Sequence, residues 1–476
     1  MSTLTALARA QAFTSGRAEP VATVRHLHLH EHPFVLVPLA MAGEANAPLA
    51  AMAGTAQSSP TLLVVPQPRN RDQRFAFAAS LAELLLPYVD SFTGVAEPIA
   101  VDRGRDVRYR LVDAPQVWVP NTGGVDFLKL FGRSTRFRQV DGDYPVPPGV
   151  PLLGRWLTFF AQSAEVPGAS LLLNSVQALG LHWATGQSSA EDAQLAALLA
   201  WITPPAGMSG RDAALEAEGQ AAGPATDPEF DNKVLAPLMA ADDVDGLTEA
   251  LREVLQPTWD QMWHTLALLR ALPPGARVAS RWDADRDVFS AFVANLAEGG
   301  PPQPRRDGAV AAAARLHRLE NAAARYAVQR AFDDPLVMAE HRLAGTAFAG
   351  TVTLADPDRI DDTGKRPVLR PRIMVATTEP VRVDPGATLT SPARPGQKAK
   401  VISVTATPTG SDVLLELSGG MGRKMVAEPG SVPAVGEQLL LTTLSEAFRP
   451  GAAFPDASET PWTHGGPGGD PPAVVE

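Results

Sequence analysis

The chain contains no cysteine, which excludes disulfides, thiolate metal sites and thiol nucleophiles. Any metal site must therefore use histidine, aspartate or glutamate. No run of about 20 apolar residues is present, and the most hydrophobic stretch, Phe34 to Met41, is interrupted by Pro38, so we expect no membrane-spanning helix. The N-terminus lacks the basic cluster and apolar run of a secretory signal, so a cytoplasmic location is expected.

Basic residues are not in excess: the chain has 41 lysines and arginines against 52 aspartates and glutamates, a formal net charge of −11. This balance argues against a surface built throughout for nucleic acid and leaves room only for a local basic patch. Complete catalytic motifs are also missing, because the sequence contains no Walker A loop, dinucleotide fingerprint or nucleophile elbow. The sequence therefore favours a protein without catalytic activity, and we expect no cofactor.

The length of 476 residues exceeds what one hydrophobic core usually supports, so two or three domains are expected. Residues 1–150 alternate short apolar runs with helical apolar spacing, which predicts an α/β domain that ends in a proline-rich stretch. Residues 151–345 predict a helical domain with an acidic loop over Pro204–Asp231. Residues 346–448 predict a small antiparallel β-barrel or sandwich, and residues 449–476 a disordered tail rich in glycine and proline. The predicted fold class is multidomain α+β.

Several segments of the predicted β domain have strand character, and Pro408–Ser411 is placed to form a hairpin turn. The segments are Arg372–Thr378, Lys398–Thr407, Asp412–Leu417 and Gln438–Thr443. Together with Pro385–Leu389 and Val435–Glu437, the pattern over about residues 385–444 resembles the small β-barrel that accompanies superfamily 1 nucleic-acid helicases. The motor motifs of those helicases are missing, so the resemblance implies an accessory chain that works beside a separate motor.

Histidines recur at every second position of one segment: His26, His28, His30 and His32. If the segment is a strand, these side chains share one face and could contribute ligands to a divalent metal. Neighbouring residues on one face of a strand lie about 6.6–7 Å apart, so one ion would need a distant carboxylate such as Glu44 or Asp72 in addition. The other interpretation, which the sequence favours, is a solvated face or an edge strand whose polar residues limit pairing.

Basic and aromatic residues are interleaved after the turn at Asn121–Gly124. They are Lys129, Phe131, Arg133, Arg136, Phe137 and Arg138. Arginines contact phosphates and aromatic rings stack on bases, so this stretch is a candidate surface for single-stranded nucleic acid. Arg69, Arg71 and Arg74, which follow a predicted strand, are candidates for the same surface. In the alternative interpretation the phenylalanines belong to the core and the arginines are their solvated neighbours.

The sequence favours a non-catalytic scaffold or accessory protein. We expect it to bind another protein, such as a helicase or nuclease, and single-stranded nucleic acid, and we expect no membrane partner. The alternative is a metal-dependent hydrolase that uses the row from His26 to His32. The two hypotheses differ in metal content, because only the hydrolase requires bound metal.

Overall fold

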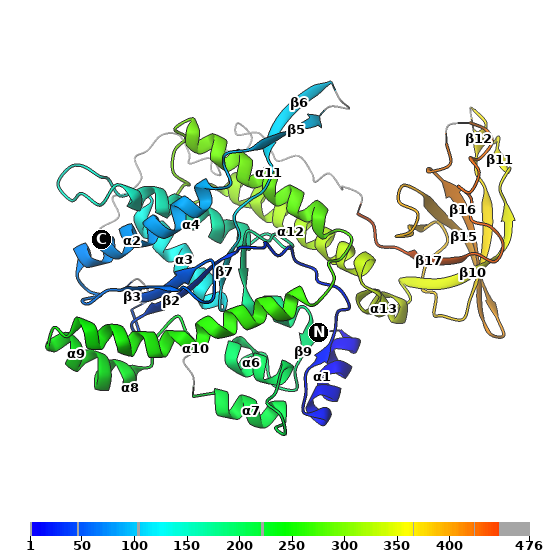
Figure 1. The fold of residues 1–476 in the computed structure, drawn as a ribbon. Helices are drawn as coiled ribbons and strands as arrows, with labels where there is room; N and C mark the ends of the chain where they lie inside the picture. Colours follow the sequence, from blue (N-terminus) through cyan, green and yellow to red (C-terminus); the bar gives the residue numbers. More distant parts are fainter. Residues whose placement is uncertain are drawn as a thin grey trace. The chain divides into compact units, whose positions relative to one another are not determined.

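The computed structural model describes residues 2–44, 47–101, 105–219, 223–364, 366–422 and 424–446. Among these, the chain divides into two compact units (Figure 1): residues 5–323 form the N-terminal unit, and residues 324–446 with residues 2–4 form the C-terminal unit. None of the described helices has the length and apolar character needed to span a membrane. The tail predicted to be disordered, residues 449–476, lies outside the described residues.

A five-stranded mixed sheet lies at the centre of the N-terminal unit, with strand order β4-β3-β2-β7-β8. Its strands are β2 (Phe34–Ala40), β3 (Pro48–Gly54), β4 (Thr61–Val64), β7 (Val117–Val119) and β8 (Leu172–Asn174). β2, β7 and β8 run parallel, whereas β3 is antiparallel to both of its neighbours. β2 is buried along its whole length, which explains its continuous apolar sequence, since a strand covered on both faces need not alternate.

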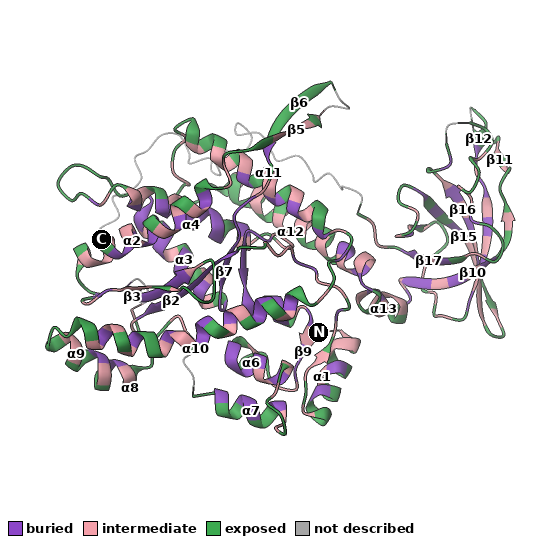
Figure 2. Ribbon diagram, viewed as in Figure 1, coloured by how far each residue is buried: buried purple, intermediate pink, exposed green. Residues whose placement is uncertain are grey.

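Helices cover both faces of this sheet (Figure 1). Phe34 and Leu36 of β2 pack in one core with four helices, and Val35 and Val37 pack in a second core with three others. The first set is α2 (Arg71–Asp90), α3 (Thr122–Thr135), α4 (Gly149–Ala164) and α11 (Val278–Ala297); the second is α5 (Ser175–Gly180), α6 (Leu195–Ile202) and α10 (Val244–Arg270). Figure 2 shows the buried residues concentrated on the sheet and on the helix sides that face it. The predicted boundary near residue 150 falls at the start of α4, which shares one core with α3.

Shorter elements complete the N-terminal unit. They are α1 (Thr3–Ser15), β1 (Glu19–Pro20), β5 (Ala96–Val101), β6 (Asp106–Leu111), β9 (Trp183–Ala184), η2 (Glu191–Ala193), α7 (Gly210–Ala217), α8 (Pro228–Phe230), η3 (Asp231–Leu235), α9 (Ala236–Ala240) and the first part of α12 (Ala309–Asp333). α7 lies inside the stretch predicted as an acidic loop. It begins after Ser209, whose hydroxyl accepts a hydrogen bond from the backbone N–H of Asp212 at 3.1 Å, so a local capping signal overrides the loop composition there.

The C-terminal unit is a near-closed antiparallel barrel with strand order β14-β15-β16-β13-β10-β17. Its strands are β10 (Ala347–Asp356), β13 (Arg372–Thr377), β14 (Thr388–Leu389), β15 (Lys398–Thr407), β16 (Gly410–Ser418) and β17 (Gln438–Thr442), beside the short pair β11 (Ile360–Asp361) and β12 (Val368–Leu369), and α13 (Pro335–Ala344) precedes them. Two backbone hydrogen bonds between Thr390 and Thr442, at 2.8 and 3.0 Å, join the ends of the sheet. The predicted α+β class with a C-terminal antiparallel β domain is confirmed, and that domain is a barrel.

Candidate functional site

The starts and ends of two helices bring several of the predicted basic residues to one place in the N-terminal unit. α2 begins after Asn70, whose side-chain oxygen accepts hydrogen bonds from the backbone N–H groups of Asp72 and Gln73. This start places Arg71 and Phe75 one helical turn apart on the same side of α2. α3 ends at Thr135, and the following residues, 136–138, leave the helix with their basic and aromatic side chains.

The first cluster of these side chains surrounds the ring of Phe75. The Cζ atom of Arg71 lies 4.8 Å from the centroid of this ring, and the Cζ atom of Arg138 lies 5.5 Å from it. Arg71 also donates a hydrogen bond to the carbonyl oxygen of Tyr144 at 2.9 Å. Tyr144 is 77% exposed, so most of its ring is accessible beside the two guanidinium groups. An accessible ring beside cations is what base stacking with phosphate contact requires.

The second cluster surrounds the ring of Phe137. Arg136 and Arg305 lie over this ring, with Cζ 4.8 and 5.0 Å from its centroid. Arg136 is held in place by hydrogen bonds that it donates to the carbonyl oxygens of Gln303 and Pro304. Burial, and then the positive charges of Arg133 and Arg305, lower the pKa of Arg136. We define the arginine-aromatic surface as Arg71, Phe75, Arg133, Arg136, Phe137, Arg138, Tyr144 and Arg305.

Most of the positive charge of the arginine-aromatic surface is not neutralised by neighbouring carboxylates. Among the described residues, no ion pair involves Arg133, Arg136, Arg138 or Arg305. The exception is Arg71, which pairs with Asp72 at 2.9 Å. Two exposed acids, at positions 141 and 143, lie in the loop that leads to Tyr144. Because like charges side by side repel, an anionic ligand would reduce the repulsion between these guanidinium groups.

The remaining predicted basic and aromatic residues lie elsewhere or have other partners. Phe131 is only 5% exposed and packs in the core with α2. Lys129 pairs with Glu165 at 2.8 Å, and Arg69 pairs with Glu44 at 2.6 Å. Arg74 is half-buried on α2. The prediction that all nine residues form one surface stays a prediction. The contacts bring Arg71 and Arg138 together at Phe75 and place Arg136 over Phe137, and the charge of Arg133 acts on Arg136.

The histidine row does not form a regular strand, and its four side chains have different surroundings. His26 is fully buried and stacks on His182, with ring centroids 5.7 Å apart. His28 stacks on Trp282 of α11 at 3.9 Å, and His32 is exposed. The structure therefore distributes the row between the core and the surface.

His30 has both ring nitrogens engaged. Its Nδ1 accepts a hydrogen bond from the backbone N–H of His32 at 3.0 Å, so the ring proton is on Nε2, which donates to Asp113 Oδ2 at 3.2 Å. Among the described residues, no group of three or more histidine, aspartate or glutamate side chains has an arrangement that could hold a metal ion. The carboxylates of Glu44 and Asp72 are instead paired with Arg69 and Arg71.

A buried glutamine and a buried aspartate hold the backbone of the histidine row. Gln116 accepts from the N–H of His30 at 3.0 Å and donates to the carbonyl oxygens of His28 and Ser170 at 2.9 and 2.8 Å. The hydroxyl of Ser170 accepts from the N–H of His28, and Asp285 of α11 accepts from the N–H of Ser170 at 2.7 Å. Burial raises the pKa of Asp285 to about 7, and burial lowers that of His28 to about 4.

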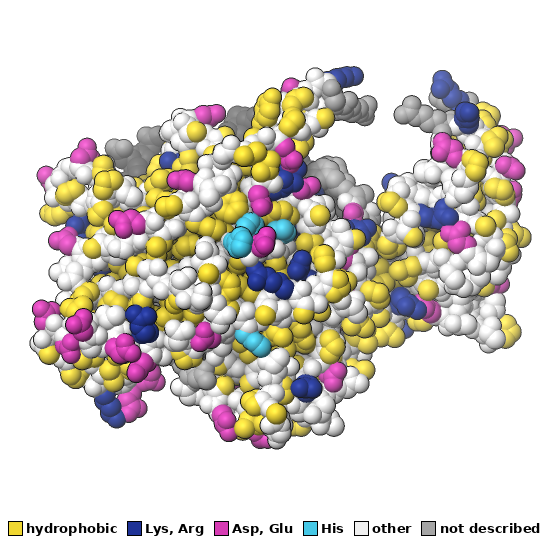
Figure 3. All heavy atoms as spheres, viewed as in Figure 1, with side chains coloured by type: hydrophobic (Ala, Val, Ile, Leu, Met, Phe, Trp, Pro, Cys, Tyr) yellow, Lys and Arg dark blue, Asp and Glu magenta, His cyan; other side chains and the backbone are white. Residues whose placement is uncertain are grey.

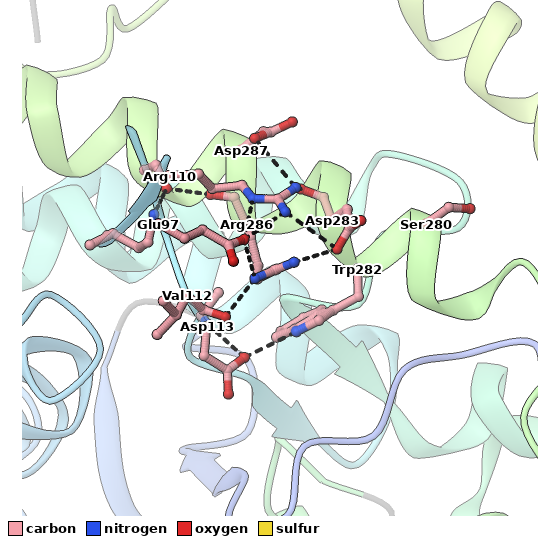
Figure 4. A network of polar contacts seen from close by, with 12 residues as sticks. Glu97, Arg110, Val112, Asp113, Ser280, Trp282, Asp283, Arg286 and Asp287 are labelled. Atoms are coloured by element: carbon pink, nitrogen blue, oxygen red, sulfur yellow. Dashed lines mark hydrogen bonds and ion pairs between the residues drawn. The ribbon is translucent and has the colours of Figure 1, made fainter. Parts of the chain in front are cut away.

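A charged network next to this site joins the β5–β6 hairpin to α11 (Figure 4). Glu97 of β5 accepts from Arg110 at 2.7 Å and from Arg286 at 3.0 Å. Arg286 also pairs with Asp283, and it donates to the carbonyl oxygen of Val112 at 2.6 Å. These contacts attach the charged face of the hairpin to the helix.

The opposite face of the hairpin is apolar and exposed. Pro98 and Ala100 of β5 lie opposite Tyr109 and Val107 of β6, so these four side chains share one face. Tyr109 is 73% exposed and Val107 is 51% exposed. Figure 3 shows hydrophobic side chains on the face of the hairpin that is turned to the viewer. This exposed apolar face is a candidate contact surface for another protein.

Three members of the arginine-aromatic surface, Phe75, Tyr144 and Arg305, were not predicted from the sequence. They come from α2, the loop after α3 and the segment before α12, and no spacing rule connects such distant positions. The one available signal was local, because Phe75 follows Arg71 at the i+4 spacing of a helix. Asp113 and Trp282, which contact the histidine row, have no comparable local signal.

Comparison with family models, curated proteins and solved structures finds no significant match to this chain. A function must therefore be argued from the contacts described above. The resemblance of about residues 385–444 to a helicase-associated barrel stays a prediction.

Proposed function

We propose that the chain is a non-catalytic accessory protein that binds single-stranded nucleic acid through the arginine-aromatic surface. The observation that carries the proposal is the gathering of arginines from three distant segments around two phenylalanine rings, beside the exposed ring of Tyr144. Guanidinium groups bind phosphates, and exposed aromatic rings stack on bases of any sequence.

A single strand suits this surface better than a duplex. The bases of a duplex are stacked on one another, so the Tyr144 ring could reach only an unpaired base. The net charge of −11 repels nucleic acid at long range, and only the local arginines attract it. Binding should therefore be weak and should depend strongly on salt.

The apolar face of the β5–β6 hairpin supports a protein partner as a second part of the proposal. Its outward residues, Val107 and Tyr109, contribute no core packing that would explain them. The suggestion that the partner is a helicase or nuclease rests on the resemblance of about residues 385–444 to the small barrel of superfamily 1 helicases. In this proposal the chain holds a single strand beside such a partner.

Titration of a fluorescent oligonucleotide at several salt concentrations tests the nucleic-acid part. Replacing Arg133, Arg138 and Arg305 together by glutamine should reduce the slope of log affinity against log salt by about 2, since each phosphate contact to a single strand contributes about 0.7. Arg136 is left unchanged because its hydrogen bonds to two carbonyl oxygens make it part of the fold. Tyr144→Ala should weaken binding by about 1–3 kcal/mol and leave the slope nearly unchanged.

A triple variant of exposed arginines elsewhere in the same unit, Arg17, Arg211 and Arg252 to glutamine, is the matched control. It lowers the net charge equally, so it should reproduce only the long-range part of the effect. If wild type does not bind at about 50 mM salt, or if the two triple variants have the same slope, the arginine-aromatic surface does not bind the strand.

A further inference from the structure

Arg25 lies near a second arginine, Arg270, in a part of the N-terminal unit outside the arginine-aromatic surface. Its backbone is fixed next to the end of α10: the Arg25 N–H donates to the carbonyl oxygen of Pro273 at 2.8 Å, and the Gly275 N–H donates to the Arg25 carbonyl oxygen at 2.9 Å. Because α10 ends at Arg270, this contact holds the two arginines in the same region.

The side chain of Arg25 lacks partners that its burial would require. Its Nε atom is buried and has no hydrogen-bond partner among the described residues, and no ion pair involves Arg25 there. Burial, and then the positive charge of Arg270, lower the pKa of Arg25. A buried guanidinium N–H without an acceptor is costly, so it normally has an acceptor.

Arg270 adds a second positive charge near Arg25. Arg270 is exposed and donates from one nitrogen to the carbonyl oxygens of His30 and Glu31, at 3.3 and 2.9 Å. These bonds leave its other N–H groups available to a ligand. Asp113, which contacts the histidine row, is already engaged by His30 and by Trp282 Nε1. Figure 3 shows histidine side chains gathered next to lysine or arginine side chains, with aspartate or glutamate side chains among them.

We propose that Arg25 and Arg270 form a binding site for a phosphate group, either free phosphate or the phosphate monoester of a nucleotide. A phosphate oxygen supplies the acceptor that Arg25 Nε lacks, and a second oxygen can pair with the same planar guanidinium group. The two negative charges of the group offset the two arginines. None of these residues belongs to the arginine-aromatic surface, so the site is independent of the proposed function.

Isothermal titration calorimetry of the full chain tests the site, with inorganic phosphate, adenosine monophosphate and adenosine as separate ligands at constant ionic strength. We expect inorganic phosphate and the monophosphate to bind, and adenosine not to bind. A tighter affinity for the monophosphate identifies a nucleotide as the source, and equal affinities identify free phosphate. Arg25→Gln and Arg270→Gln should each weaken phosphate binding at least tenfold, whereas Arg17→Gln, at an exposed position, should not.

A thermal melt in chloride buffer separates a ligand site from a structural arginine. If Arg25 awaits an anion, Arg25→Gln removes a poorly compensated charge and should raise the melting temperature without phosphate, while the rise that phosphate produces in wild type disappears. A lower melting temperature for Arg25→Gln with unchanged phosphate binding would overturn the proposal. Equal binding of phosphate by wild type and Arg270→Gln would overturn it as well, and this exposed variant should fold in any case.

Discussion

Asp285 of α11 is linked to the histidine row through Ser170, and the pH dependence of stability tests its protonation state. Its side chain is 6% exposed and accepts a hydrogen bond from the N–H of Ser170 at 2.7 Å. Burial raises the pKa of Asp285 from 3.8 to about 7, although the Ser170 hydrogen bond and the charge of Arg281 act in the other direction. The folded protein therefore keeps this carboxyl group protonated at pH values where the unfolded chain has lost the proton.

The sign and size of the effect follow from proton binding. Between about pH 4 and 7 the folded state binds more protons at Asp285 than the unfolded state, so this contribution to stability is complete below pH 4 and is lost as pH rises through 7. The difference between 3.8 and about 7 is about 3 units at 1.36 kcal/mol each, so the loss reaches about 4 kcal/mol.

His28 acts in the opposite direction over an overlapping range. Burial is the main cause that lowers its pKa from 6.5 to about 4, so its contribution to stability is complete above pH 6.5 and is lost as pH falls to 4. The loss is about 3 kcal/mol. In wild type the two contributions largely cancel between pH 4 and 6.5, so these two groups together leave stability nearly independent of pH.

Replacing Asp285 by asparagine separates the two contributions. Asparagine keeps the acceptor for the Ser170 N–H but does not ionise, so the variant should match wild type near pH 4 and exceed it by about 4 kcal/mol at pH 8.5. Its stability should rise between pH 4 and 6.5, because of these two groups only His28 then contributes. Urea unfolding followed by tryptophan fluorescence measures this, because all tryptophans except Trp462 lie in residues 118–282.

The matched control is Asp126→Asn, at an exposed position on α3. Its difference from wild type should stay small across the same pH range. If the difference between Asp285→Asn and wild type were the same at pH 4 and pH 8.5, the carboxyl group would not be protonated in the folded state and the reasoning would fail.

Two further predictions concern packing and the hairpin. Gly154 lies where α4 crosses the end of α3, and an added Cβ would be 2.3 Å from the backbone N of Arg136, so Gly154→Ala should destabilise the unit by about 1–3 kcal/mol in urea and weaken oligonucleotide binding. Gly180→Ala, where the added Cβ meets nothing within 4 Å, should change neither. The double variant Val107→Ser, Tyr109→Ser should keep the melting temperature of wild type but lose the capture of a protein partner. Val288→Ser, at another exposed position, should keep that capture. Equal capture by wild type, the double variant and Val288→Ser would show that the hairpin is not the contact surface.

The sequence predicts the C-terminal unit better than the N-terminal unit because the information there is local. Strands such as β15 and β16 are joined by a short turn, and along part of each strand buried residues alternate with more accessible ones. In the N-terminal unit, β8 has only three residues and pairs with β7 more than 50 residues earlier, so no local period indicates it. The helices that follow then look like a separate domain, although they cover the same sheet.

The candidate site is harder to predict because its partners are distant in the chain. The spacing of the histidines indicates a shared face only if the segment is a strand. The segment is not a strand, and it forms hydrogen bonds with the side chains of Gln116 and Asp113. The basic and aromatic pattern at the end of α3 includes Arg136, but the contact with Arg305 depends on how the segment before α12 returns to the same place.

The arginines of this chain differ in whether a neighbouring carboxylate neutralises their charge, and this difference is more informative than the number of basic residues. Arg110 and Arg286 are surrounded by carboxylates from β5 and α11, so their charges serve to attach the hairpin to the helix. Arg25 and Arg136 have an arginine as a charged neighbour, and among the described residues they have no ion pair. In a chain with 11 more acidic than basic residues, carboxylates are abundant, and their absence at both places is informative. At Arg25, whose buried Nε has no acceptor among the described residues, an anionic ligand explains the neighbouring arginine better than folding alone, whereas two carbonyl oxygens already hold the guanidinium group of Arg136.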